Sequence, residues 1–124
     1  MRVLLDTHVL LWALAAPSKL PEKARDQLMA ADVYVSAASI WEISIKAALG
    51  KLKVAPREVL EAIAPAGFTL LPVTGEHAAG VSELPAIHRD PFDRMLAAQA
   101  SIEPMILLTN DKALVGYGSF VNLI

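Results

Sequence analysis

Short apolar runs alternate with longer segments of helical periodicity along the whole chain. The runs are rich in Val, Leu, Ile and aromatic residues, which is typical of buried strands. They predict strands over 2–5, 33–35, 68–73, 105–108 and 120–123. Helical spacing predicts helices over 8–15, 21–31, 37–49, 56–66, 74–83 and 90–102. Strands that alternate with helices favour the α/β class, in which right-handed crossovers build a mostly parallel sheet with helices on both faces.

Capping residues mark where several of these helices begin and end. Ser36 precedes the helix 37–49 as a typical N-cap, and a glycine follows that helix. Asp90 and Pro91 begin the last helix, because Asp is a preferred N-cap and Pro fits the first helical position. The pattern contains no repeat, linker or low-complexity segment, so we expect a single domain over residues 1–124.

The composition narrows the class of protein. The 124 residues are 55% hydrophobic with a mean hydropathy of +0.46, which excludes a disordered chain. The segment 9–16 is apolar on every side, and a helix of that kind is buried in a core or in an interface. A small domain has little interior in which to bury such a helix, so we expect self-association or a protein partner.

Charge and cysteine content exclude further classes. The formal net charge of −2 gives no global basic signature, so contact with nucleic acid requires a local patch. The absence of cysteine excludes disulfides and thiolate metal sites and permits the cytoplasmic location that we expect. Arg2 and the run 9–16 imitate a short signal peptide, but Asp6 interrupts the apolar stretch. No run reaches the ~18 apolar residues of a membrane-spanning helix.

Acidic residues stand where two of the predicted strands end. Asp6 follows the first strand, and Asp111 follows the late apolar strand. Ligands of open α/β sheets bind beyond the carboxyl ends of the strands, so these two carboxylates are candidates for a site. Each also has a simpler interpretation, Asp6 as a helix N-cap and Asp111 as a turn residue beside Asn110.

Glu42 lies within a predicted helix, where it shares an apolar stripe with Ala38 and Ile45. A carboxylate on that stripe points toward the core or a cleft, where it needs a partner. The alternative is an ion pair with Lys46, one turn later on the same helix. Ser39, one turn earlier, adds a hydroxyl to the same cleft.

Asp90 and Asp93 stand three residues apart in HRDPFDRMLAAQA. As the N-cap, Asp90 would accept backbone N–H bonds and keep little freedom to bind a metal. Asp93, one turn into the helix, has a weaker structural alternative as a capping-box partner, since Glu or Gln is usual there. We therefore favour Asp93 for the pocket.

Carboxylates that converge in one small cleft repel one another and take up protons unless a cation holds them. Ligands that are all oxygen select Mg²⁺ or Mn²⁺. Such an ion can acidify a water and neutralise charge on a phosphodiester, while a carboxylate takes the proton. Metal-dependent phosphodiester hydrolysis is therefore a chemistry that these acids could carry out without histidine or cysteine.

Basic and aromatic residues supply weaker signals. His88, Arg89 and Arg94 form the best local basic patch for phosphate contacts. The residues that could extend this patch are Lys46, Lys51, Lys53 and Lys112. His77 is expected on a polar helix face, and His8 packed or capped on the first helix. Trp12 and Trp41 are expected as core or interface aromatics.

Four motifs together resemble the PIN-domain family, specifically its VapC-type toxins from toxin–antitoxin pairs. They are LLDTHVLLW at 4–12, SAASIWEISIK at 36–46, HRDPFDRMLAAQA at 88–100 and LLTNDKAL at 107–114. The resemblance implies a three-layer α/β/α fold with strand order 3-2-1-4-5. It further implies an endoribonuclease dependent on Mg²⁺ or Mn²⁺, inhibited by an antitoxin of VapB type, and usually a homodimer.

The resemblance also assigns residues by motif position. Asp6 and Asp93 match the family's principal metal ligands, and Glu42 and Asp111 match the other two acids of its quartet. Supporting polar positions match Thr7, Ser39, Thr109 and Asn110. Asp90 belongs to the DPFDR segment, which many PIN domains lack.

Two other functions compete with this interpretation. A phosphoacceptor module of the receiver type also has an acidic pocket and Mg²⁺, but it requires adjacent acids after the first strand and an aspartate after the third. A non-catalytic PIN module would keep the acidic pocket only to receive a partner's basic side chain.

Overall fold

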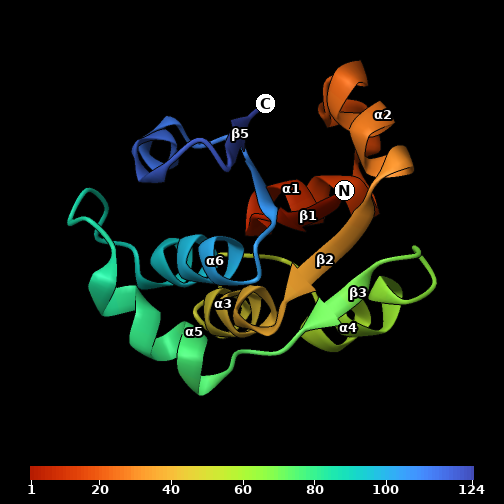
Figure 1. Cartoon of the computed structure of the whole chain (residues 1–124). Helices are drawn as coiled ribbons and strands as arrows, with labels where there is room; N and C mark the ends of the chain where they lie inside the picture. Colours follow the sequence, from red (N-terminus) through yellow and green to blue (C-terminus); the bar gives the residue numbers. More distant parts are fainter.

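The computed structural model describes all 124 residues and shows a five-stranded sheet with helices on both faces (Figure 1). The strands are β1 (Arg2–Leu5), β2 (Asp32–Ser36), β3 (Thr69–Leu71), β4 (Ile106–Thr109) and β5 (Val121–Leu123). The α-helices are α1 (Thr7–Ala15), α2 (Glu22–Ala30), α3 (Ala37–Ala48), α4 (Pro56–Ile63), α5 (Gly75–Gly80) and α6 (Pro91–Ile102). Three short 3₁₀ helices complete the chain: η1 (Pro17–Lys19), η2 (Val81–Glu83) and η3 (Lys112–Tyr117).

The strand order is β3-β2-β1-β4-β5, and every neighbouring pair is parallel. The expected α/β class and the expected order are both confirmed. The receiver-type alternative is wrong for this chain, because receivers have the order 2-1-3-4-5. β1 lies in the centre of the sheet, so the residue that follows it, Asp6, lies beside β4 at the switch point of strand order.

The two faces of the sheet carry two apolar clusters. Val3 and Leu5 of β1 face a cluster with side chains from α1, α2, α3 and α4. Leu4 of β1 and Leu107 of β4 face the other cluster, to which α6 and η3 contribute. The central strands are therefore buried on both faces, as the continuous apolar runs of a parallel sheet require.

Several element boundaries differ from the sequence pattern, for reasons that lie in the chain. The expected helix 56–66 ends at Ile63, ahead of Pro65. The expected strand 68–73 pairs only over 69–71, since Pro72 has no N–H to donate. The expected helix 74–83 divides into α5 and η2. The 3₁₀ helices η1 and η3 are too short to show a periodicity.

The chain itself covers most of α1, which the sequence pattern singled out as apolar all round. Val9 and Leu10 are buried, and Leu11, Trp12 and Leu14 are half-buried against the same cluster. The large apolar side chains that remain exposed lie elsewhere in the chain, among them Trp41 and Ile45 on α3 and Leu49 directly after it. None of the helices is both long enough and apolar enough to cross a lipid bilayer.

Candidate metal centre

Asp6 is held where β1 passes into α1, at the carboxyl edge of the sheet. Its Oδ1 accepts a hydrogen bond from the backbone N–H of Val9 at 2.9 Å and caps α1. Its Oδ2 accepts a hydrogen bond from the hydroxyl of Thr109, the last residue of β4. The side chain is buried, and this burial raises the pKa of Asp6. The structure confirms Asp6 as the cap of α1, and its carboxylate also lies close enough to Glu42 and Asp93 for their charges to act on one another.

Glu42 reaches the same edge from α3 and is also buried. Its Oε1 accepts a hydrogen bond from the Thr7 hydroxyl at 2.7 Å, and Ser39 Oγ lies 3.0 Å from that hydroxyl. Its Oε2 lies 2.6 Å from Lys46 Nζ, and the hydrogen bond to Glu42 raises the pKa of Lys46. The ion pair with Lys46 is therefore present, but its acidic half lies inside the cleft and not on a wet surface.

Asp90 and Asp93 have divided roles at the start of α6. Asp90 Oδ1 accepts hydrogen bonds from the backbone N–H groups of Phe92 at 2.8 Å and Asp93 at 3.2 Å, which confirms the predicted cap. Asp93 accepts no backbone hydrogen bond. Burial, followed by the negative charges of Asp90 and Asp6, raises the pKa of Asp93 to about 7. Asp93 is therefore the acid that most needs a positive charge nearby.

His88 joins the acidic cluster, which the sequence did not indicate. Its Nε2 lies 3.1 Å from Asp93 Oδ2 and 3.3 Å from Asp111 Oδ2. Its Nδ1 accepts the backbone N–H of Asp90 at 3.2 Å, so the proton of the neutral ring is on Nε2 and faces the two carboxylates. The signal in the sequence is the spacing: a histidine two residues before a cap can accept that cap's N–H.

Asp111 completes the group from the segment that follows β4. Its Oδ1 accepts the backbone N–H of Ala113 at 2.9 Å and caps η3, and its own N–H donates to Thr109 Oγ1 at 3.0 Å. Ligand atoms of His88, Asp93 and Asp111 all lie within 4.8 Å of one another. Asp93 and Asp111 can therefore approach a single ion, while His88, with its Nε2–H facing these two carboxylates, is a donor to them and not a ligand.

The donor set fits a hard divalent cation. Asp6, directly after β1, and Glu42 on α3 lie close enough to Asp93 for their charges to act on its pKa. The ligand atoms that lie within 4.8 Å of one another are those of His88, Asp93 and Asp111, and Asp6 and Glu42 are not among them. Oxygen donors of this kind suit Mg²⁺ and Mn²⁺. Burial first, and then the negative charges of neighbouring acids, raise the pKa of Asp93 even with His88 beside it. A divalent ion would offset these negative charges.

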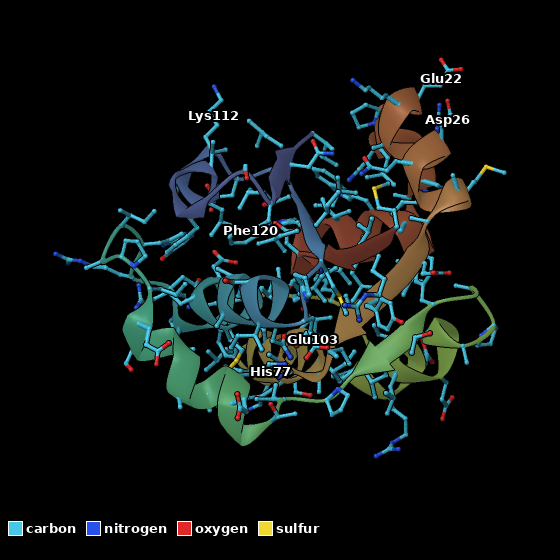
Figure 2. All side chains as sticks on the ribbon, viewed as in Figure 1. Glu22, Asp26, His77, Glu103, Lys112 and Phe120 are labelled. Carbon is cyan, nitrogen blue, oxygen red and sulfur yellow. The ribbon has the colours of Figure 1, made fainter.

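In the structure, some residues of the expected basic patch are engaged by contacts within the chain, and the others are exposed. Arg94 donates to the carbonyl oxygens of Pro85 at 3.0 Å and Val81 at 2.8 Å, and to the Tyr117 hydroxyl at 3.2 Å. Its guanidinium therefore fixes the loop before α6, which leaves fewer of its N–H groups free for a phosphate. His88 lies among the acids, and Lys46 is paired with Glu42. The exposed members of the predicted patch are Arg89, Lys112, Lys51 and Lys53 (Figure 2 labels Lys112). Asn110, which was predicted as a supporting polar position, is also exposed.

His77 is not on a polar face, contrary to the sequence prediction. It is 1% exposed, and its Nε2 lies 2.5 Å from Glu103 Oε2. Its Nδ1 accepts the N–H of Thr74, whose hydroxyl accepts the N–H of His77, in a capping box at the start of α5. Figure 2 shows His77 and Glu103 side by side. The pair joins α5 to the end of α6 and lies outside the acidic cluster.

Known proteins of the same fold were found by two comparisons. The profile of the family described as PIN domain matches residues 3–118. VapBC2 from Rickettsia felis, bound to a DNA fragment from their promoter, matches with a TM-score of 0.72 and 16% identity, over 100% of this chain and 98% of that chain. DNA-bound VapBC from Salmonella typhimurium matches with a TM-score of 0.69 and 17% identity, over 100% and 97%.

A third structure, FitAcB from Neisseria gonorrhoeae, matches with a TM-score of 0.64 and 23% identity, over 93% of this chain and 91% of that chain. At these identities the likeness establishes the fold. A sequence search of curated proteins returns no significant match.

Proposed function

Because this chain belongs to the PIN-domain family, we propose that it is a metal-dependent endoribonuclease and the toxin of a toxin–antitoxin pair. One observation carries the catalytic part of the proposal. Asp6, Glu42 and Asp93 come from three separate elements and meet closely enough that Asp6 and Glu42 both help to raise the pKa of Asp93 to about 7. A buried, incompletely balanced acidic cluster of this kind is typical of a site that binds a cation.

The side chains have distinct tasks in the proposed site. Asp93 and Asp6 are the principal ligands for Mg²⁺ or Mn²⁺, with Glu42 and Asp111 as the further acids. Thr109 orients Asp6, and Thr7, supported by Ser39, orients Glu42, through the hydroxyl contacts described above. His88 donates from Nε2 toward Asp93 and Asp111 and keeps these two carboxylates together. Asp90 holds the first turn of α6, which positions Asp93.

The proposed reaction is hydrolysis of an RNA phosphodiester bond. A water attacks phosphorus, one of its protons passes to a carboxylate of the cluster, and the bond from phosphorus to the 3′ oxygen breaks while that oxygen takes up a proton from solvent. The products are a 5′-phosphate and a 3′-hydroxyl. A divalent ion, when bound, would neutralise charge on the phosphate and acidify the water. Arg89 and Lys112, which are exposed near these elements, are the remaining candidates for contact with the RNA backbone.

A non-catalytic PIN module is the second candidate, and a specific observation favours it. Lys46 and His88 already contact Glu42, Asp93 and Asp111, so the chain partly balances its own acids. These contacts leave the pKa of Asp93 raised to about 7, however, which supports a site that still lacks positive charge. Metal-dependent cleavage decides between the two candidates.

The experiment measures cleavage of RNA by the purified chain, freed of any antitoxin, in Mg²⁺, in Mn²⁺ and in EDTA. We expect cleavage only with a divalent ion, and none from Asp6→Asn or Asp93→Asn, both of which should retain the wild-type circular dichroism. Cleavage that persists in EDTA or in both variants would overturn the metal mechanism.

The toxin part of the proposal has its own test. Two of the fold relatives are VapBC complexes, which supports a VapB-type antitoxin as the partner and a cytoplasmic site of action. Expression of this chain should arrest growth, and co-expression of a small open reading frame adjacent to its gene should relieve the arrest. Growth that continues at wild-type rate despite active enzyme in the cell would indicate a housekeeping nuclease.

A further inference from the structure

Arg94 directly follows Asp93 on α6, and its half-buried side chain is tied to η2, to the loop before α6 and to η3. Its Nη2 donates to the carbonyl oxygen of Val81 in η2 at 2.8 Å, and its Nη1 donates to that of Pro85 in the loop at 3.0 Å. Nη1 also donates to the hydroxyl of Tyr117, the last residue of η3, at 3.2 Å. One guanidinium therefore joins the segments that lie on either side of the start of α6.

The loop that Arg94 holds carries His88, and Figure 1 shows this loop running from the end of η2 to α6. The carbonyl oxygen of His88 lies 3.5 Å from Arg94 Nη1. The His88 ring in turn lies 3.1 Å from Asp93 Oδ2 and 3.3 Å from Asp111 Oδ2. The guanidinium therefore fixes the backbone of the residue whose ring bridges the two carboxylates.

The second segment, η3, carries the other of these two carboxylates. It begins after its cap, Asp111, and ends at Tyr117. Its Gly116 lies directly against the loop, because a Cβ at that position would be 2.8 Å from Cδ1 of Ile87. The loop and η3 are therefore in contact with each other, and Arg94 ties both of them to α6.

We propose that Arg94 is a positioning residue for the metal site, which holds the loop and η3 against α6 so that Asp93 and Asp111 stay close enough to share one ion. The proposal rests on the metal-dependent function proposed above. Asp93 lies on α6 and Asp111 follows β4, so no single element sets their separation. Residues that orient metal ligands from behind typically change metal affinity by about 10–100-fold when they are replaced.

The contacts of Arg94 favour positioning over the two other tasks that an arginine could have here. It forms no ion pair with a carboxylate, although it directly follows Asp93. Its acceptors are backbone carbonyls and a phenol that lie in different directions, which suits a planar fork of N–H groups and not the point charge of a lysine. A phosphate contact needs N–H groups that face solvent, whereas the chain engages both Nη1 and Nη2.

Isothermal titration with Mn²⁺ separates positioning from charge by the direction of the effect. Arg94→Met removes a positive charge near the acids, which by charge alone would strengthen the binding of a cation. Positioning predicts the opposite, a loss of more than about tenfold. Arg94→Lys keeps the charge but loses the fork, so its affinity should also fall. Arg57→Met, at an exposed position on α4, is the control and should bind Mn²⁺ as the wild type does.

Three results would overturn the proposal. The first is Mn²⁺ affinity in a folded Arg94→Met variant that equals or exceeds that of the wild type. The second is full recovery of the affinity in Arg94→Lys, which would show that only the charge matters. The third is wild-type Mn²⁺ affinity together with weaker binding of RNA, which would identify Arg94 as a phosphate contact.

The ring ¹⁵N signals of the histidines test the positioning in EDTA, without metal and without RNA. Both Arg94 variants should shift the signals of His88, because the loop that carries it is released. They should leave those of His77 in place, since Glu103 holds that ring at the opposite end of α6. Tyr117→Phe removes only one acceptor and serves if the Arg94 variants unfold; it should shift the His88 signals by a smaller amount.

This measurement keeps the two proposals separate. If the wild type binds no divalent ion, the nuclease mechanism fails, and the His88 signals alone decide whether Arg94 holds the cluster. Unchanged His88 signals in folded variants of Arg94 and Tyr117 would overturn the positioning role even if the wild type cleaves RNA with Mg²⁺ or Mn²⁺.

Discussion

At the scale of single residues, most acids of the site have a structural task as well as a chemical one. Asp6 caps α1, Asp90 caps α6 and Asp111 caps η3. Asp93 is the exception, since the backbone gives it no hydrogen bond and its environment opposes its charge. The residue with the least structural reason to be acidic is therefore the one for which a metal ion provides the best explanation.

The first prediction concerns the pH dependence of stability in the absence of metal. The pKa of Asp93 rises from 3.8 in the unfolded chain to about 7 in the folded one, so the folded state binds the proton more tightly. Stability from this group therefore falls as pH rises from about 4 to 7. Asp93→Asn should unfold at higher temperature than the wild type at pH 8, and the gain should fade toward pH 4.

Asp93→Asn should raise the free energy of unfolding at pH 8 by about 1–2 kcal/mol. This is less than the full shift of the Asp93 pKa implies, because water screens a side chain that is 20% exposed. Thermal unfolding in EDTA measures it. Asp26→Asn, on the exposed surface of α2, is the control and should show no such trend. An Asp93→Asn variant less stable than the wild type at pH 8 would show that the folded structure does not destabilise the charged form of Asp93.

The sequence could identify the acids but not every partner that surrounds them. The strand ends placed Asp6 and Asp111 at one edge, and the apolar stripe placed Glu42 in a cleft; the structure agrees with these positions. The polar-face prediction for His77 is wrong, and the place of His88 beside Asp93 and Asp111 was missed, because both depend on a ring nitrogen that accepts a nearby backbone N–H. That geometry depends on loop conformation, which residue periodicity does not encode.

At the scale of elements, the beginning of α6 determines where Asp93 points. Asp90 accepts two backbone N–H groups there, so Asp90→Ala should cost about 1 kcal/mol relative to Asp90→Asn, which is itself a good cap. Both substitutions remove the same charge, so their difference in the free energy of unfolding isolates the cap. Denaturant titration measures this difference, and equal stabilities would show that the cap contributes nothing.

The contact between α5 and the end of α6 gives a further prediction. Glu103→Ala would leave the Nε2–H of His77 without an acceptor in a buried position, which should cost about 1–3 kcal/mol. Glu103→Gln keeps an acceptor and should lose less. Glu76→Ala, an exposed position on α5, is the control. If Glu103→Ala unfolds at the same denaturant concentration as Glu76→Ala, the buried pair does not stabilise these helices.

Periodicity predicted the elements well where proline and tertiary contacts do not intervene. β1, α3 and α6 have almost the expected bounds. The segment between α4 and α5 was less accurate, since Pro65 and Pro72 end elements that the apolar pattern would extend. The hydrophobic periodicity indicates which face of an element is apolar. The length of the element depends on strand pairing and on prolines, which lack a backbone N–H.

At the scale of the whole molecule, strand order assembles the site. Because β1 lies between β2 and β4, Asp6 comes next to Thr109 and faces the helix that follows β2. Alternation of strands and helices predicts a parallel sheet but leaves several orders open; the order came from the four motifs in register. The same architecture leaves Trp41 and Ile45 of α3 exposed, although the sequence pattern pointed to the first helix as the partner surface.

The central claim is that the acids at this edge hold a divalent ion and that Asp93, not Asp90, is a ligand. Isothermal titration of the purified chain with Mn²⁺ or Mg²⁺ tests it most directly. The wild type should bind the ion, Asp93→Asn should bind it more than about tenfold more weakly, and Asp90→Asn should stay close to the wild type. A wild type that binds neither ion, or equal losses in the two variants, would contradict the account.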